Sequence, residues 1–88
     1  MVRLLLAIYD NKAEVYFAPF VAATMGAAYR NLADEVNKKG DPSNMLASHP
    51  GDFELCDLGS YDDETGYIEV HKSPKMICKL SDLVIAAE

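Results

Sequence analysis

The chain has 88 residues and carries 8 Lys and Arg against 14 Asp and Glu, which gives a formal net charge of −6. This length allows a single domain, residues 1–88, and a hydrophobic content of 50% excludes a disordered tail. No apolar run approaches the roughly 20 residues that cross a bilayer, and two cysteines are too few for a disulfide framework. We therefore expect a small cytoplasmic domain with no membrane partner.

The first predicted elements form a hairpin. Residues 2–9 are apolar on both sides of a strand, and such a strand is normally covered on both sides. Asp10-Asn11-Lys12 is typical of a turn, because Asn tolerates the left-handed conformation. Residues 14–18 form a short second strand, which Pro19 ends because proline cannot donate to a ladder.

A helix is predicted over residues 24–39. Thr24 is a good N-cap, since its hydroxyl can accept from an early backbone amide. Gly40 favours the left-handed conformation that ends a helix. Apolar residues recur between them at spacings of three and four, which marks one buried face. This stripe consists of Met25, Ala28, Tyr29, Leu32, Ala33 and Val36.

A long loop and a second hairpin follow the helix. Residues 40–52 contain two prolines and several turn formers, and loops of this length are often functional. Strands over residues 53–61 and 66–72 then flank an acidic turn. Pairing Tyr61 with Tyr67 in this hairpin places Asp57 opposite His71.

The tail, residues 73–88, has an uncertain structure. Ser81 can cap a short helical turn, and the same residues can equally form an added strand. Both alternatives stay open.

The element order β-β-α-β-β predicts an α+β fold in which one helix packs on one face of a small antiparallel sheet. A helix of about 15 residues is roughly 22 Å long and covers only one side of such a sheet. The second apolar side needs a cover, and in a chain this short the simplest cover is another copy. We therefore expect a homodimer through the other face or an edge, involving strand 2–9 or strand 53–60.

An ordered set of short motifs between Tyr9 and Gly66, about two thirds of the chain, resembles one family. The motifs are Tyr9-Asp10, Pro19-Phe20, the helix start Thr24-Met25-Gly26, His49-Pro50-Gly51-Asp52-Phe53, and Leu58-Gly59-Ser60-Tyr61-Asp62. In this combination the chain is similar to the small non-structural protein of gokushoviruses, the microviruses with small circular single-stranded DNA genomes.

The resemblance implies a phage accessory protein made in the cytoplasm of the infected bacterium and absent from the virion. Members of that family are often labelled DNA-binding, with a role in viral DNA replication or in the switch to packaged single strands. The expected partners are a second copy of the chain, single-stranded DNA, and phage or host replication proteins. The alternative function is a protein-binding module that engages a host or phage factor through an apolar edge or the loop 40–52, without contacting nucleic acid.

Single-stranded DNA binding needs bases stacked on aromatic rings beside a basic groove. The candidate contacts are Tyr9, Tyr16 and Phe17, together with Arg3, Lys12 and Arg30. In the competing interpretation the aromatic residues are core or dimer interface and the cations form a solvated rim. The charge favours the competing interpretation, since residues 45–88 hold all of the excess negative charge and repel a phosphate backbone.

No catalytic group of residues stands out, and we expect no enzyme activity. His71 opposite Asp57 resembles the base and its orienting carboxylate in a catalytic site. No sequence motif, however, marks Cys56, Ser60 or Ser73 as the nucleophile that such a site needs. An exposed ion pair between strands is the commoner arrangement of such residues. We interpret His49, which precedes Pro50, as a residue that anchors the loop.

No metal or cofactor is expected either. The acidic turn Asp62-Asp63-Glu64 is too short for a calcium loop, whose ligands spread over about twelve residues. Cys56 and Cys78 lack the close spacing of zinc ligands, and the chain has no glycine-rich phosphate loop.

Overall fold

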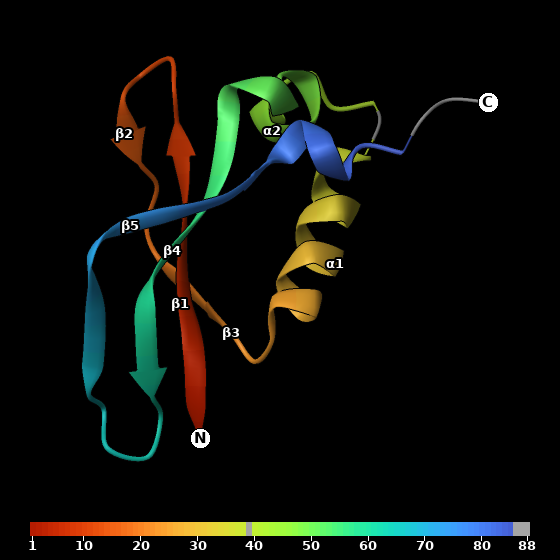
Figure 1. Cartoon of the computed structure of the whole chain (residues 1–88). Coiled ribbons are helices and arrows are strands. Elements are labelled where there is room, and N and C mark those ends of the chain that lie inside the picture. The colour runs from red at the N-terminus through yellow and green to blue at the C-terminus, as the bar shows by residue number, and fades with distance from the viewer. Residues whose placement is uncertain (39, 86–88) are drawn as a thin grey trace.

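The computed structural model describes residues 1–38 and 40–85, and it has the predicted α+β architecture of an antiparallel sheet with one main helix (Figure 1). Four elements precede the loop of residues 40–52, two lie within it and three follow it. They are β1 (Val2–Asp10), β2 (Val15–Tyr16), β3 (Phe20–Ala22), α1 (Met25–Val36), α2 (Met45–Ser48), the 3-10 turn η1 (Pro50–Asp52), β4 (Phe53–Asp62), β5 (Ile68–Lys79) and the 3-10 turn η2 (Leu80–Leu83). In the described part of the chain, no helix combines the length and the hydropathy that a membrane span requires.

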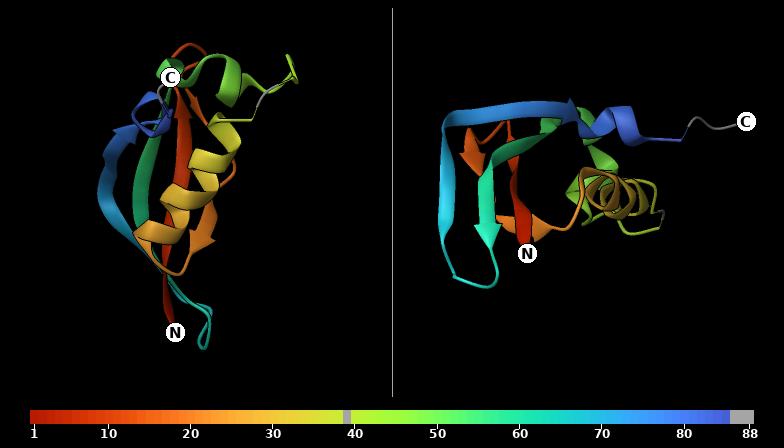
Figure 2. Two further views of the ribbon diagram at one scale, coloured as in Figure 1. Left: turned by 90° about the vertical axis from the view of Figure 1, so that its right-hand side faces the viewer. Right: turned by 60° about the horizontal axis from the view of Figure 1, so that its bottom comes forward.

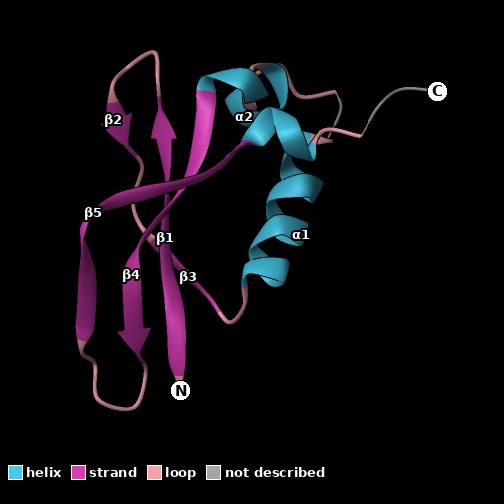
Figure 3. Ribbon diagram, viewed as in Figure 1, coloured by secondary structure: helices cyan, strands magenta, loops and turns pink. Residues whose placement is uncertain are grey.

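The sheet is built around β1 (Figure 3). On one side β1 pairs with β4, and β4 pairs with β5, every pair being antiparallel. On its other side β1 pairs with β3 at Leu4–Leu6 and with β2 at Tyr9 and Asp10, so the two short strands form one interrupted edge. Pro19 lies between β2 and β3. No hydrogen bond between strands is lost there, although proline has no backbone N–H to donate.

A bulge bends β5 across the sheet. Leu58 of β4 stands opposite the four residues 71–74 of β5, because Asp57 pairs with Lys75 and Gly59 pairs with Val70. Figure 2 shows the result, in which the first half of β5 runs beside β4 and the second half turns sharply toward the helices. Gly59 has φ 153°, and a Cβ there would lie 1.9 Å from the backbone oxygen of Glu69. Only glycine therefore fits this close approach of β4 and β5.

Figure 2 shows α1 against one face of the sheet, and the core lies between them. Thr24 caps α1 as predicted, its Oγ1 accepting from the Ala27 amide at 3.1 Å. The apolar stripe of the helix then faces the even-numbered residues of β1 and the first half of β4. The buried cluster consists of Leu6, Ile8, Ala28, Leu32, Val36, Phe53, Leu55 and Leu80.

The tail closes this core. Residues 73–79 continue β5, and η2 then places Leu80 in the core with no exposed surface. Asn37, the C-cap of α1, holds the tail in place. Its Nδ2 donates to the carbonyl oxygen of Leu83 at 3.0 Å, and its Oδ1 accepts from the Ile85 amide at 2.8 Å. Residues 86–88 lie outside the described residues.

Four sequence predictions differ from the structure in detail. The helix ends at Val36, because Asn37 caps it before Gly40 is reached. The predicted strand 14–18 is reduced to β2, the unpredicted β3 follows Pro19, and the predicted loop contains α2 and η1. In the second hairpin Tyr61 pairs with Ile68, one residue beyond the predicted partner, since the Asp62 amide donates to the Tyr67 carbonyl inside the turn.

Candidate functional site

The three cations predicted to contact DNA lie in different parts of the molecule. Arg3 is near the start of β1, Lys12 is in the turn beyond its end, and Arg30 is on the exposed side of α1. At about 3.3 Å per residue, the seven residues from Arg3 to the end of β1 alone span roughly 23 Å. The structure therefore does not gather these cations into one basic groove.

Arg3 is paired with an acidic residue. Its Nε donates to Asp63 Oδ2 at 2.8 Å, and the N-terminal ammonium group donates to Asp63 Oδ1 at 2.6 Å. This ammonium group and Arg3 hold the pKa of Asp63 below its ordinary value, and Asp63 in turn raises the pKa of the terminal amine. The positive charge of Arg3 is thus largely compensated before any phosphate arrives.

Two of the three predicted aromatic residues come together. Tyr9 and Tyr16 pair across β1 and β2, and their ring centroids lie 4.6 Å apart at an angle of 52°. Partial burial is the main cause that raises the pKa of Tyr16, and the neighbouring Cys56, Tyr9 and Glu54 raise it further. Phe17 lies elsewhere, with its ring centroid 5.7 Å from that of the core residue Phe53.

The strand register shows that Tyr9 and Tyr16 belong to a second, largely apolar side of the sheet, opposite α1. We call this side the open face. Ala7 and Cys56 lie at its centre, and both are buried although neither belongs to the core against α1. Its residues are Arg3, Leu5, Ala7, Tyr9, Tyr16, Val21, Glu54, Cys56, Gly59, Tyr61, Ile68, Val70, Met76 and Lys79.

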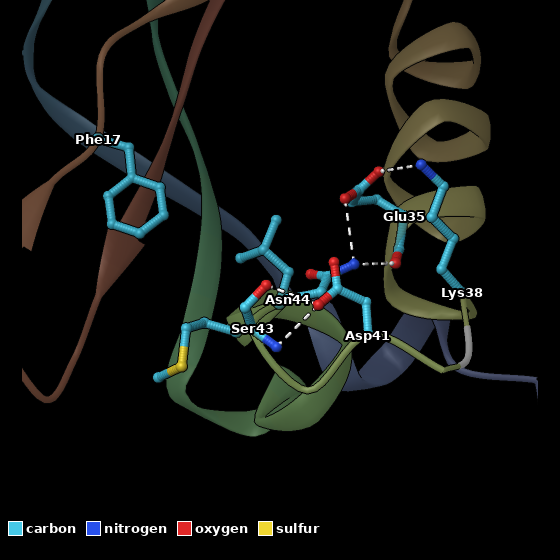
Figure 4. A pocket seen from close by; sticks show the side chains of 8 residues that line it. Phe17, Glu35, Lys38, Asp41, Ser43 and Asn44 are labelled. Atoms are coloured by element: carbon cyan, nitrogen blue, oxygen red, sulfur yellow. Dashed lines mark hydrogen bonds and ion pairs between the residues drawn. The ribbon is translucent and has the colours of Figure 1, made fainter.

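A groove of about 500 Å³ lies on the helix side (Figure 4). One wall is polar, because Glu35 binds both Lys38 Nζ at 3.1 Å and Asn44 Nδ2 at 3.2 Å. The floor is shaped by the loop 41–44 and α2, and the exposed apolar residues Phe17 and Met45 line the groove. This is a hollow with one fixed polar side and one apolar side.

Asp41 is fixed within the groove. Its Oδ1 accepts from the Ser43 hydroxyl at 2.6 Å and from the Ser43 amide at 3.0 Å. These bonds hold the pKa of Asp41 below its ordinary value, so the groove carries this negative charge at neutral pH. Sequence reasoning pointed to the loop 40–52 as functional but did not identify the groove, because its walls come from α1 and Phe17 as well.

His71 and Asp57 do approach each other, at 3.1 Å between Nε2 and Oδ1. The bulge brings them together, since the register partner of Asp57 is Lys75. Asp57 Oδ1 also accepts from the Gly59 amide at 3.1 Å, which ties this carboxylate to the bend.

Burial raises the pKa of Cys56, so its thiol is protonated at neutral pH and is a poor nucleophile.

The remaining candidate residues have structural contacts. His49 caps α2 with its amide bound to the Met45 carbonyl, and Asp62 Oδ1 accepts from the Glu64 amide inside the acidic turn. Among residues 1–38 and 40–85, no three His, Cys, Asp or Glu side chains are placed to share a metal ion.

Comparison with known proteins places the chain in a family. The model of the phage ORF5 protein family matches residues 4–83, nearly the whole chain. No curated protein and no solved structure matches. The match agrees with the phage family that the sequence motifs implied. The chain therefore belongs to the phage ORF5 protein family and is a non-structural accessory protein of a bacteriophage.

Proposed function

We propose that this family member is a non-enzymatic gokushovirus protein that serves viral DNA replication or single-strand genome production by binding another protein. Its partner is a phage or host replication protein in the cytoplasm of the infected cell. The observation that carries this proposal is the groove, which exposes 53% of Met45 and 41% of Phe17 beside fixed carboxylates. The role in replication rests on the gokushovirus motifs in the sequence.

The chemistry of the groove suits a protein segment better than a nucleic acid. Exposed apolar side chains gain from burial against another apolar side chain, at about 25 cal/mol per Å². Lys38 compensates the charge of Glu35, whereas Asp41 is bonded to the neutral Ser43 and keeps a negative charge that repels phosphate and attracts Lys or Arg. The partner segment is therefore expected to present an apolar residue next to a basic one.

The test is complementation of a phage that lacks this gene, with the ratio of double-stranded to single-stranded viral DNA as the readout. Met45→Asp is expected to reduce single-strand accumulation about as strongly as the absence of the protein, since it places a charge on the apolar side of the groove. Tyr67→Asp changes another exposed residue outside the groove and is the matched control. A normal ratio with folded Met45→Asp protein would contradict the proposal.

A second candidate function is weak binding of single-stranded DNA, which the Tyr9–Tyr16 pair favours. Exposed aromatic rings stack on bases for about 1–3 kcal/mol per base, whatever the sequence. The phosphate contacts would be Arg3, Lys12 and Arg30, and Phe17 would be a further aromatic contact. If two copies neutralise about four to six phosphates, a plot of the logarithm of the binding constant against the logarithm of the salt concentration has a slope near −3 to −4.

Titration of an oligonucleotide at several salt concentrations tests this candidate. Changing Arg3, Lys12 and Arg30 together to Ala is expected to abolish binding, whereas Lys75→Ala and Lys79→Ala are expected to matter little. If the triple variant still binds the oligonucleotide, the DNA-binding site lies elsewhere on the molecule. No binding at roughly 50 mM salt would exclude this function and leave the protein-binding function.

A further inference from the structure

The open face is organised in four rows that cross the sheet, each including one residue of β1. The two middle rows are apolar and the charges lie in the two outer rows. The rows are Arg3, Tyr61, Ile68; then Val21, Leu5, Gly59, Val70; then Ala7, Cys56, Met76; and then Tyr16, Tyr9, Glu54, Lys79.

The exposed residues of this face lie on β2, β3 and β5, on either side of the half-buried or buried residues of β1 and β4. Val70 is 71% exposed, Ile68 58% and Met76 50%, and Tyr16 and Val21 are also classed as exposed. Apolar side chains that are exposed together on one side of a sheet mark an interaction site. A standard interface takes about 800 Å² per partner, a modest part of the 5891 Å² of this chain.

The edges of the sheet are less suited to association than its face. The edge formed by β2 and β3 is interrupted at Pro19, and the outer edge of β5 contains Pro74 and the cations Lys72 and Lys75. Proline and lysine on an edge strand discourage pairing with another strand. The apolar open face is thus left as the surface to be covered.

We propose that a second copy of this chain covers the open face, through a two-fold axis that crosses the strands at the level of Leu6. Such an axis sets each strand over the same strand of the partner in the reverse direction. The row of Leu5 then lies over the partner's row of Ala7. The bulky Leu5 meets the partner's small Ala7, Gly59 leaves room for the partner's Cys56, and Val70 meets the partner's Met76. Two sheets packed in this way lie about 10 Å apart.

The charges are complementary under the same axis. Arg3 of one copy lies over the partner's Tyr9 and beside the partner's Glu54, and the symmetry repeats this contact. A guanidinium group over a tyrosine ring is favourable, and the partner's Glu54 adds a second carboxylate to Asp63, which Arg3 already binds at 2.8 Å within its own chain. The open face itself holds two cations and one anion, so most of the negative charge of each copy lies away from the interface.

The proposed dimer has two consequences for the sites described above. It leaves the groove on the helix side free, so it stands independently of the protein-binding function. It covers Tyr9 and Tyr16, so stacking of DNA bases on these rings and dimerisation exclude each other.

Sedimentation equilibrium tests the dimer, with the 9.7 kDa of one chain as the reference mass. The wild-type protein is expected to show twice this mass at tens of micromolar. Val70→Lys is expected to raise the dissociation constant at least about tenfold, because it places a charge inside the interface. Val15→Lys, at an exposed valine whose register puts it on the helix side, is the matched control and leaves the dimer intact.

A charge swap tests the axis. Arg3→Glu and Glu54→Lys are each expected to weaken the dimer, and the double variant is expected to recover it to within a few-fold. Arg3 and Glu54 lie about 20 Å apart within one chain, so recovery arises only across the interface.

Three results would overturn the proposal: a wild-type monomer at tens of micromolar, a dimer that Val70→Lys leaves unchanged, or a double variant without recovery. Ile68→Lys, on the same face, replaces Val70→Lys if that variant fails to fold.

Discussion

Arg3 and Asp63, sixty residues apart in the chain, are joined by a 2.8 Å bond that fixes the start of β1 to the turn between β4 and β5. The N-terminal amine binds the same carboxylate and is the larger cause of its lowered pKa. Ion pairs therefore stabilise this end of the sheet, in addition to the backbone hydrogen bonds between the strands.

The pKa of Asp63 is expected to respond more to the amine than to Arg3. Acetylation of the N-terminus should raise it toward 3.8 more than Arg3→Ala does, as measured by NMR titration of the carboxyl carbon. Because the folded-state pKa is the lower one, the carboxylate stabilises the fold above pH 3.8, and this stabilisation is lost as the pH falls through the lowered value. Asp41, held by Ser43, is the internal control and should keep its lowered pKa throughout. If acetylation leaves the pKa of Asp63 unchanged, the N-terminal amine is not the main cause of its lowered pKa.

Leu32→Ala is expected to lower the free energy of unfolding by about 2–4 kcal/mol, because Leu32 lies in the middle of the buried stripe of α1 and its loss leaves a cavity. Urea denaturation measures the change. Arg30→Ala, on the exposed side of the same helix, should change it by less than about 0.5 kcal/mol. Equal effects of the two variants would mean that the helix packs through another face.

Gly59→Ala is expected to cost at least about 3 kcal/mol, because the new Cβ would meet the Glu69 backbone oxygen and neither strand can move alone. Gly51→Ala is the matched control, since open space surrounds that position. Thermal unfolding of the two variants compares them directly. A Gly59→Ala protein as stable as the control would show that β4 and β5 approach less closely than described.

Thr24→Ala is expected to cost about 1 kcal/mol, through loss of the bond that the Ala27 amide donates. Thr24→Ser keeps the hydroxyl and should retain most of this stability in the same denaturation experiment. If Ser and Ala were equally destabilising, the hydroxyl would not be the cap.

The helix and the central strand could be predicted because their signals are local. The spacing of Ala28, Leu32 and Val36 predicts one buried face, and the apolar run of residues 2–9 predicts a central strand. The hairpin was also predicted, whereas the pairing of Tyr9 with Tyr16 was seen only in the structure. These features depend only on neighbouring residues, which the sequence displays directly.

The bulge, β3 and most of the open face could not be predicted in the same way. Ser73 and Pro74 look like the end of a strand, yet β5 continues through them because the bend and the free edge tolerate a proline. The shifted register depends on the contact between Gly59 and Glu69, which is not local. Without β5 in full length, Met76 could not be placed beside Cys56.

The position of Leu80 has a consequence for when this protein can fold. Leu80 completes the core with one of the last described segments, and β1 must pair with residues of β4 that lie up to sixty positions later. During synthesis β1 can pair early with β2 and β3, but its other edge has no partner until β4 has left the ribosome. Folding dominated by such distant pairings is slow compared with that of helical domains of the same size. Newly made chains thus pass through an interval in which an apolar strand edge is uncovered, and such edges are prone to aggregation.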